Sequence, residues 1–358
     1  MPKPQETALL IVNGQEFSDW ESVWVQQRWA DSFTYFRFTA AERDPIFTKQ
    51  GSFPLWQKLQ FKPGDTCTVV LAGQLAVTGY IETRQVAYDA HQHGVMLIGK
   101  SNTAPAARSS VNTKTGNFDK KNIVQVAQEV LQGYPVGVKV IGAPDLTPFD
   151  KLQNEKGELI WDFLERIARP RGVVMGSDEK GNFLLIGDHS TSSVAELVEG
   201  RNIKSCQCTI TIEHIYEEMR VDAQTAASDD NSGTAASELT AQVGSAVGTP
   251  LKSFLLTAAE QPVKTQGEVQ SRARNESIWH DYTQVQATII TQGWLSDGVN
   301  LWHAGDKVFV NSPMAMLNND MKIQNCTFTQ DSNSGTQTTL DVVMPGLLRD
   351  TEGFNPGP

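Results

Sequence analysis

The chain has few of the residues that cross-link a protein or bind metals. It contains only 4 cysteines and 6 histidines in 358 residues. Apart from one Cys-x-Cys pair the cysteines are scattered, and each lies among alternating apolar residues typical of a strand: Cys67, Cys206, Cys208 and Cys326. We therefore expect buried thiols rather than a disulfide framework or a zinc site.

Long hydrophobic runs are also missing. The first apolar run, from Ala8 to Val12, ends at Asn13-Gly14 and is too short for the core of a signal peptide. No other stretch approaches the roughly 18 consecutive apolar residues that a membrane helix requires. We expect no membrane-spanning segment, and a chain that stays in a cytosol-like compartment or leaves it without a cleavable signal.

Basic residues are the minority among the charges. Lys and Arg number 30 against 41 Asp and Glu, which gives a formal net charge of −11. This balance argues against a protein whose main task is to clamp nucleic-acid phosphates. The 28 glycines and 16 prolines fit a turn-rich globular protein and exclude a collagen-like or wholly disordered chain.

Sequence motifs of familiar enzymes do not occur: there is no nucleophile elbow, P-loop, zinc-protease helix or dinucleotide-binding fingerprint. His91 and His93 lie close together, but without a third histidine nearby a solvated turn is favoured over a metal site. The densest acidic groups, where a glycosidase pair would be sought, fall on a strand edge and in a hairpin turn: Glu213, Glu217, Glu218, Asp178 and Glu179. We predict no catalytic, cofactor-binding or metal-binding residue.

The residues that are present predict mostly strands, with one mixed segment in the middle. Alternating or apolar runs recur through the first hundred residues. Over 113–190 the order changes to α-β-α-β-β, with Asn122 as the N-cap of the first helix and Arg169-Pro170 ending the second. Strands return at 205–221, a helix is predicted around 265–280, and further strands follow. Residues 222–249 are small and polar and predict a long mobile loop.

An internal repeat links the two strand-rich parts. Gly64-Asp65 opens a strand, and Gly305-Asp306 opens another at an offset of 241 positions, with apolar alternation after both. Further on, Ile81 aligns with Ile323 and Leu97 with Leu340. Two explanations remain open at this point: any two β-meanders align this well, or a barrel is duplicated on either side of an inserted module.

The order of strands, repeat and insert resembles the central baseplate hub proteins of contractile-tailed phages of the Mu type. Three stretches carry the resemblance: LLIVNGQEFSDWESVWVQQ, FKPGDTCTVVLAGQLAVTGYIETRQ and, most specifically, ELIWDFLERIARPRGVVMGSDEKGNFLLIGD. A weaker match follows in QVQATIITQGWLSDGVNLWHAGDKVFVN. The family is also similar to the base of type VI secretion spike proteins.

The resemblance implies an α+β, mostly β chain with two similar β-barrel (tube-type) domains flanking an inserted α+β module. The expected divisions are a first barrel at 1–105, the module at 106–195, a second barrel at 196–350 and a tail at 351–358. Gly64, Asp65, Gly305 and Asp306 would be the structural turns of the repeated barrel. Three chains would form a homotrimeric ring with near-sixfold symmetry.

In function, the resemblance implies a non-enzymatic virion component that is assembled in the host cytoplasm. The ring would join a sixfold tail tube above to a trimeric spike below, contact surrounding baseplate proteins and carry DNA in transit during ejection. Part of the acidic charge would then line the channel and keep DNA from sticking. The alternatives are a tail-associated cell-wall-degrading or carbohydrate-binding protein, suggested by the 8 tryptophans, and a β-rich binding protein of host metabolism.

Overall fold

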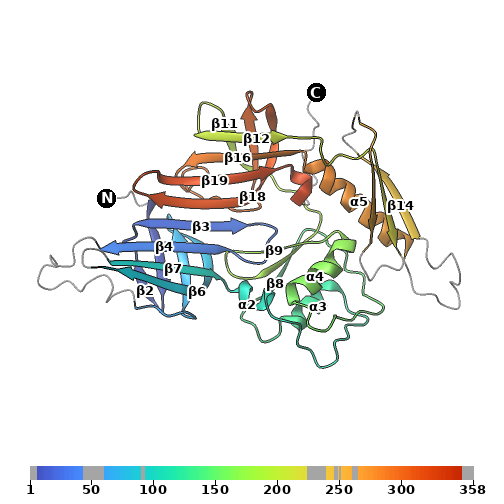
Figure 1. Cartoon of the computed structure of the whole chain (residues 1–358), viewed down its shortest axis with the longest axis horizontal. Helices are drawn as coiled ribbons and strands as arrows, with labels where there is room; N and C mark the ends of the chain where they lie inside the picture. The colour runs from blue at the N-terminus through green and yellow to red at the C-terminus, as the bar shows by residue number, and fades with distance from the viewer. Residues whose placement is uncertain are drawn as a thin grey trace, which may run out of the picture.

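A computed structural model describes residues 6–42, 60–89, 93–223, 239–245, 249, 251–259 and 265–348. Strands are the commonest element among them, and the largest sheet runs through both the N-terminal and the C-terminal part of the chain (Figure 1). A smaller mixed module and a helix-covered three-stranded arm project from one end of this sheet. The prediction of a mostly β chain with α+β content is confirmed.

Eight antiparallel strands form the long layer of the large sheet. In order they are β12 (Ser205–Ile210), β16 (Val285–Gln292), β19 (Gly335–Val343), β18 (Leu317–Asp331), β3 (Ser22–Arg28), β4 (Tyr35–Glu42), β7 (His93–Ser101) and β6 (Gln74–Tyr88). Figure 1 shows them from β12 at the top to β6 at the bottom. The two halves of the chain therefore meet in one sheet, where β18 pairs with β3.

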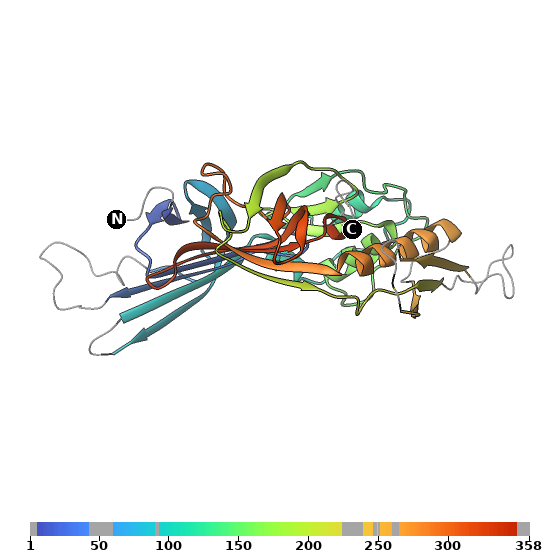
Figure 2. The ribbon, with the colours of Figure 1, turned by 90° about the horizontal axis from the view of Figure 1, so that it is seen from above.

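Shorter strands cover one face of this layer. In the first half they are β5 (Thr66–Leu71), β1 (Ala8–Val12) and β2 (Gln15–Phe17), and in the second half β17 (Lys307–Ser312) and β11 (Ser193–Val198). Seen edge-on in Figure 2, these strands lie on one side of the long strands. The main hydrophobic core lies between the layers and includes residues of both halves.

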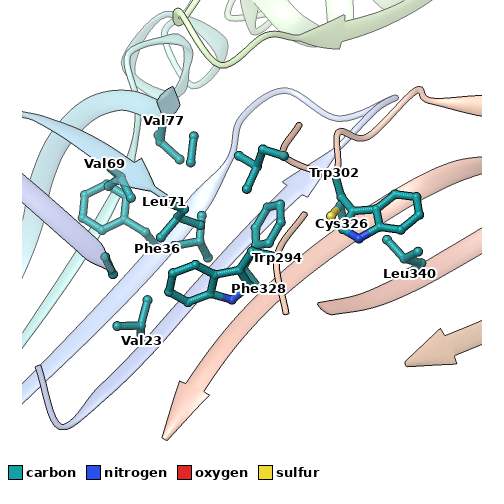
Figure 3. Packing of buried hydrophobic residues seen from close by; sticks show 14 of the residues in the cluster. Val23, Phe36, Val69, Leu71, Val77, Trp294, Trp302, Cys326, Phe328 and Leu340 are labelled. Carbon is teal, nitrogen blue, oxygen red and sulfur yellow. The ribbon is translucent and has the colours of Figure 1, made fainter. Parts of the chain in front are cut away.

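Alternation along the strands explains why they bury one face. In β3 the pattern SVWVQQR places Val23 and Val25 in the core, while Trp24 and Gln26 point to the other side. Figure 3 shows Val23 and Phe36 of the first half packed with Trp294 and Phe328 of the second half. We call the side of the eight strands that faces this cluster the core face, and the opposite side the open face.

The two barrels expected from the resemblance are not closed among the described residues. Each half folds into two layers, but no described strand pair joins β2 back to β3, or β11 back to β12. The physical reason in the first half is that β3 already pairs with β4 on one side and with β18 on the other. The strand that would close the barrel instead joins the two halves.

The inserted module has its own core, which lies between helices and a three-stranded sheet. Its elements are α2 (Thr103–Ala107), α3 (Ile123–Val130), β8 (Val138–Ile141), α4 (Ile160–Ala168), η3 (Arg169–Arg171), β9 (Val174–Ser177) and β10 (Phe183–Ile186). Asn122 caps α3 with a full capping box, as the sequence predicts. α4 ends at Ala168, just before Arg169-Pro170, and Gly172 then adopts a left-handed conformation.

The arm lies within the second half. It consists of β13 (Glu218–Ala223), β14 (Leu239–Gly244), β15 (Phe254–Ala258) and α5 (Gln266–Tyr282), and a short η5 (Pro345–Leu348) follows the last strand of the chain. The prediction of one loop over 222–249 is wrong at both ends, because β13 extends to Ala223 and β14 pairs with it under α5. Residues 224–238 lie outside the described part. No helix among the described residues is long and apolar enough to span a membrane.

Candidate assembly surface

The Gly-Asp turns singled out in the sequence have the same hydrogen bonds in both halves. Gly64 N–H donates to the Ile81 carbonyl at 2.8 Å, and Ile81 N–H donates back to the Asp65 carbonyl at 2.9 Å. In the second half Gly305 N–H donates to Ile323 at 2.8 Å, and Ile323 N–H donates to Asp306 at 2.9 Å. The φ angles of the glycines are 96° and 94°, a region that favours glycine. Each turn ties the start of one strand to the middle of the next.

The aspartate side chains of the two turns also act alike. The Asp65 carboxylate accepts from the Lys62 N–H at 2.8 Å, and the Asp306 carboxylate accepts from the His303 N–H at 2.9 Å. The surroundings differ, since burial raises the pKa of the Asp306 carboxyl. The four predicted turn residues thus form two separate, equivalent turns and are not brought together into one site.

A difference in packing distinguishes the two glycines. A Cβ on Gly64 would meet nothing within 4 Å, whereas a Cβ on Gly305 would lie 2.2 Å from Cε3 of Trp29. Trp29 follows β3, and its N–H donates to the Gln324 carbonyl of β18 at 2.9 Å. Its ring also lies 5.7 Å from the buried Lys322 Nζ. The second turn is therefore part of the junction between the two halves.

The open face is rich in amides and hydroxyls. Across the second half it presents Gln207, Thr209, Gln286, Thr288, Asn325, Thr327, Thr329, Gln337 and Thr339. The first five of these and Asp341 line a shallow depression of about 330 Å³, together with neighbouring residues of β16, β18 and β19. Asp341 accepts from Thr288 at 2.8 Å and from Asn325 at 3.1 Å. In the first half Arg37 lies 5.9 Å from the Trp24 ring. Charges of both signs are present, so this face is not an acidic surface.

At each end of the eight-stranded layer a stretch of strand has a neighbour on one side only in the described part of the chain. β12 pairs with β16 alone. β6 pairs with β5 up to Tyr80, and from Thr83 to Tyr88 its pairing strand is β7. Edge strands of this kind are sites where another chain adds to a sheet.

Large apolar side chains are exposed at both edges. Register places Val86 and Tyr88 on the core face of β6, yet they are 44% and 76% exposed, and Ile210 on the core face of β12 is 47% exposed. Cys206 and Cys208 lie beside Ile210 on the same face of β12, half-buried, and burial raises the pKa of both thiols. Neither edge is predictable from the sequence, because pairing across a sheet is not visible in the alternation of one strand.

A cleft of about 490 Å³ separates the inserted module from the arm. Trp161 of α4 and Trp279 of α5 line it, together with the Arg272–Glu276 ion pair. Hydrogen bonding to His280, whose Nε2 lies 3.5 Å from the Glu276 carboxylate, and the contact with Arg272 lower the pKa of Glu276 to about 2. This carboxylate therefore stabilises the arm in its ionised form.

Acid should weaken the arm through Glu276. Because the pKa of this carboxyl falls from 4.5 to about 2 on folding, its stabilisation is complete above pH 4.5 and is lost as the pH falls towards 2. After allowance for solvent screening we expect about 1–2 kcal/mol. Urea unfolding of Glu276→Gln at pH 7 should show this loss, with a weaker acid dependence than the unaltered chain. Equal dependence of the two on pH between 4.5 and 2 would contradict the assignment.

The acidic residues considered for catalysis do not gather into one site. Asp178 lies in the β9–β10 turn, where it accepts from the Asn182 N–H at 2.7 Å and pairs with Lys139 at 2.5 Å. Burial alone would raise the pKa of Asp178, but these hydrogen bonds lower it. Within the described ranges no three His, Cys, Asp or Glu side chains are grouped so as to hold a metal ion. His91 lies outside the described residues.

Comparisons with known proteins agree with this arrangement. Residues 7–101 match the family model of the N-terminal domain of Mu phage baseplate assembly protein GpP-like proteins, and residues 103–187 match that of the second domain of baseplate hub protein gp44-like proteins. Together the two matches cover half of the chain. The baseplate hub protein gp44 of Escherichia phage Mu is 21% identical over 97% of this chain and 89% of its own length.

Solved structures share the fold over nearly the whole chain. The 43 kDa tail protein of prophage MuSo2 from Shewanella oneidensis has a TM-score of 0.80 at 22% identity, covering 96% of this chain and 100% of that one. A tail protein from Neisseria meningitidis has a TM-score of 0.78 at 19% identity, covering 96% and 98%. An Escherichia coli component of the type VI secretion system has a TM-score of 0.59 at 11% identity, covering 97% and 79%.

Proposed function

This chain belongs to the family of Mu-type phage baseplate hub proteins and has a structural role in the tail, and we propose that three copies of it close into a ring. The ring joins the sixfold tail tube to a trimeric spike, contacts surrounding baseplate proteins and forms the conduit for DNA ejection. It has no catalytic activity of its own. It forms part of the virion and assembles in the host cytoplasm.

The observation that carries the ring is the eight-stranded layer with an edge at each end. Eight is an even number and all neighbouring strands are antiparallel, so β6 and β12 run in opposite directions. Rotation about an axis along the strands keeps their directions, so β6 of one copy can pair antiparallel with β12 of the next. Three copies then close a ring with eight strands from each, in which neither β6 nor β12 is an edge strand.

Two similar halves in each copy allow a threefold ring to match a sixfold tube. Three copies present six strand-rich halves, each with the same Gly-Asp turn. Six similar halves fit a sixfold tube, while the single module and the single arm of each copy keep the ring threefold for a spike. We also propose domain divisions at 105 and 195, and the end of β7 at Ser101 and the start of β11 at Ser193 support them.

The open face suits the wall of the conduit. In the ring the short strands that cover the core face lie on the outside, so the open face lines the lumen. This face carries mainly amides and hydroxyls. The lining is then nearly neutral rather than acidic, and DNA phosphates meet few fixed cations that would hold them. The net acidic charge lies elsewhere on the molecule.

Added cations in the lumen should slow DNA passage. Thr339→Lys on the open face of β19 places three lysines in the ring, one from each copy. These lysines attract DNA phosphates, and salt weakens that attraction. We expect particles with this hub to eject DNA several-fold more slowly at low salt and to recover at high salt. Thr339→Gln is the neutral control. Equal ejection by the two variants at every salt concentration would contradict a lumenal open face.

Solution mass tests the proposed ring. A trimer has about 118 kDa, three times the 39.4 kDa of one chain, and should show a central hole by negative-stain microscopy. A particle of 39.4 kDa at all concentrations, alone and with its spike, would contradict it.

A further inference from the structure

The two halves correspond strand by strand, and the hydrogen-bonded registers make the correspondence residue-specific. β6 pairs with β7 as β18 pairs with β19, each after a bulge, so that Arg84 opposite Leu97 corresponds to Cys326 opposite Leu340. Counting along β6 and β18 from this point, Val86 corresponds to Phe328. The same count relates Tyr88 to Gln330.

The edge strand β12 corresponds to β3 in the same way. Leu97 of β7 lies opposite Phe38 of β4, which lies opposite Val23 of β3. In the second half Leu340 lies opposite Ile289, which lies opposite Cys206 of β12. Cys206 therefore corresponds to Val23. Two residues further along, Cys208 corresponds to Val25.

Within one chain the two halves already make the contact that a ring would repeat. β3 of the first half pairs with β18 of the second, with Phe328 opposite Val25. Both side chains have 0% exposure. On the open face of the same strand pair, the Gln26 amide donates to the Thr327 hydroxyl at 3.0 Å.

We propose that β6 of one copy pairs antiparallel with β12 of the next in this same register, so that Val86 lies opposite Cys208 of the next copy. Tyr88 then lies opposite Cys206, and Arg84 opposite Ile210. The inference rests on the proposed ring and adds the residues that form it. The occupant of both edges is a second copy of this chain.

Exposure also supports this register. Val86, Tyr88 and Ile210 are exposed large apolar side chains on the core face, whereas Phe328, which corresponds to Val86 in the internal contact, is buried. Pairing in the proposed register covers all three. Buried apolar area of this kind stabilises an interface at about 25 cal/mol per Å².

Polar complementarity supports it as well. Gln85 corresponds to Thr327, and Thr209 corresponds to Gln26, so the proposed register places a glutamine opposite a threonine once more. The Gln–Thr hydrogen bond of the internal contact is reproduced on the open face with the two partners exchanged. A shift by one residue would lose this pair and would set the core face of one copy beside the open face of the next.

Cross-linking through the native cysteine tests the register. In Val86→Cys the new thiol should react with Cys208 of the next copy through a short bifunctional thiol reagent, giving covalent dimers and closed trimers. Within one copy the two residues are separated by seven strand spacings, roughly 33 Å along the sheet, so no internal link forms. Cys67 and Cys326 are buried and add no background.

Two controls make the outcome specific. Ala87→Cys places the thiol one residue along, on the open face, and should link at least tenfold less; Val86→Cys combined with Cys208→Ser should also lose most of the product. Trimers by mass that do not link through Val86→Cys, or that link equally through Ala87→Cys, would overturn the register and leave the ring intact. Monomers throughout would overturn the ring itself.

Discussion

Val86→Asp should convert the trimer to monomers without unfolding the chain. Val86 is 44% exposed in the single chain, so a carboxylate there stays hydrated and the fold is kept. In the ring the same carboxylate would be buried directly opposite Cys208, whose thiol is neutral. A buried unpaired charge costs several kcal/mol, and about 3 kcal/mol per interface would weaken association roughly a hundredfold.

A variant with the same added charge at another position of β6 distinguishes the effect of position from the effect of charge. Ala87→Asp adds the same charge on the open face, which remains in contact with solvent in the ring, and should weaken association less than about tenfold. Mass photometry over a concentration series measures both variants, and circular dichroism checks that both are folded. Trimers of undiminished stability in Val86→Asp would contradict burial of β6 between copies.

The second large effect is expected at the turn of the second half. Gly305→Ala forces a left-handed φ of 94° on alanine and drives its Cβ into the Trp29 ring at 2.2 Å. Backbone strain of about 1–2 kcal/mol and overpacking of about 1–3 kcal/mol add to about 2–5 kcal/mol lost in unfolding free energy. The loss should appear as a lower urea midpoint.

Gly64→Ala provides the comparison that the repeat makes possible. Its φ is 96°, but nothing lies within 4 Å of the added Cβ, so only the backbone strain of about 1–2 kcal/mol applies. The difference between the two variants therefore measures the packing of Gly305 against Trp29 at the junction of the halves. Equal losses would mean that Trp29 moves aside without cost and that the junction is not tightly packed.

Local features of the fold could be predicted from the sequence because single residues determine them. Asn122 begins α3 as its cap, and the two Gly-Asp pairs mark equivalent turns because a positive φ favours glycine. Strand β14 is not predicted because it lies in a stretch of mostly small and polar residues and carries few apolar ones, Leu239, Ala241 and Val243. It is a strand because β13 and α5 cover it, which depends on residues distant in the sequence.

The assembly surface could be predicted only as far as the resemblance reached. The sequence indicates two similar halves but not that β3 pairs with β18, since the pairing of distant strands leaves no periodic signal in either. Val86 and Ile210 read as ordinary core residues of alternating strands. Only their exposure in the folded chain distinguishes them from Phe328.

A density map of the assembled hub, at a resolution that separates strands, tests the central claim most directly. The account predicts three copies around one axis and a continuous antiparallel ring of strands in which β6 of each copy lies beside β12 of the next. Val86 should then face Cys208 across every interface. A trimer held together through the arms or the inserted modules, with β6 and β12 apart, would contradict it.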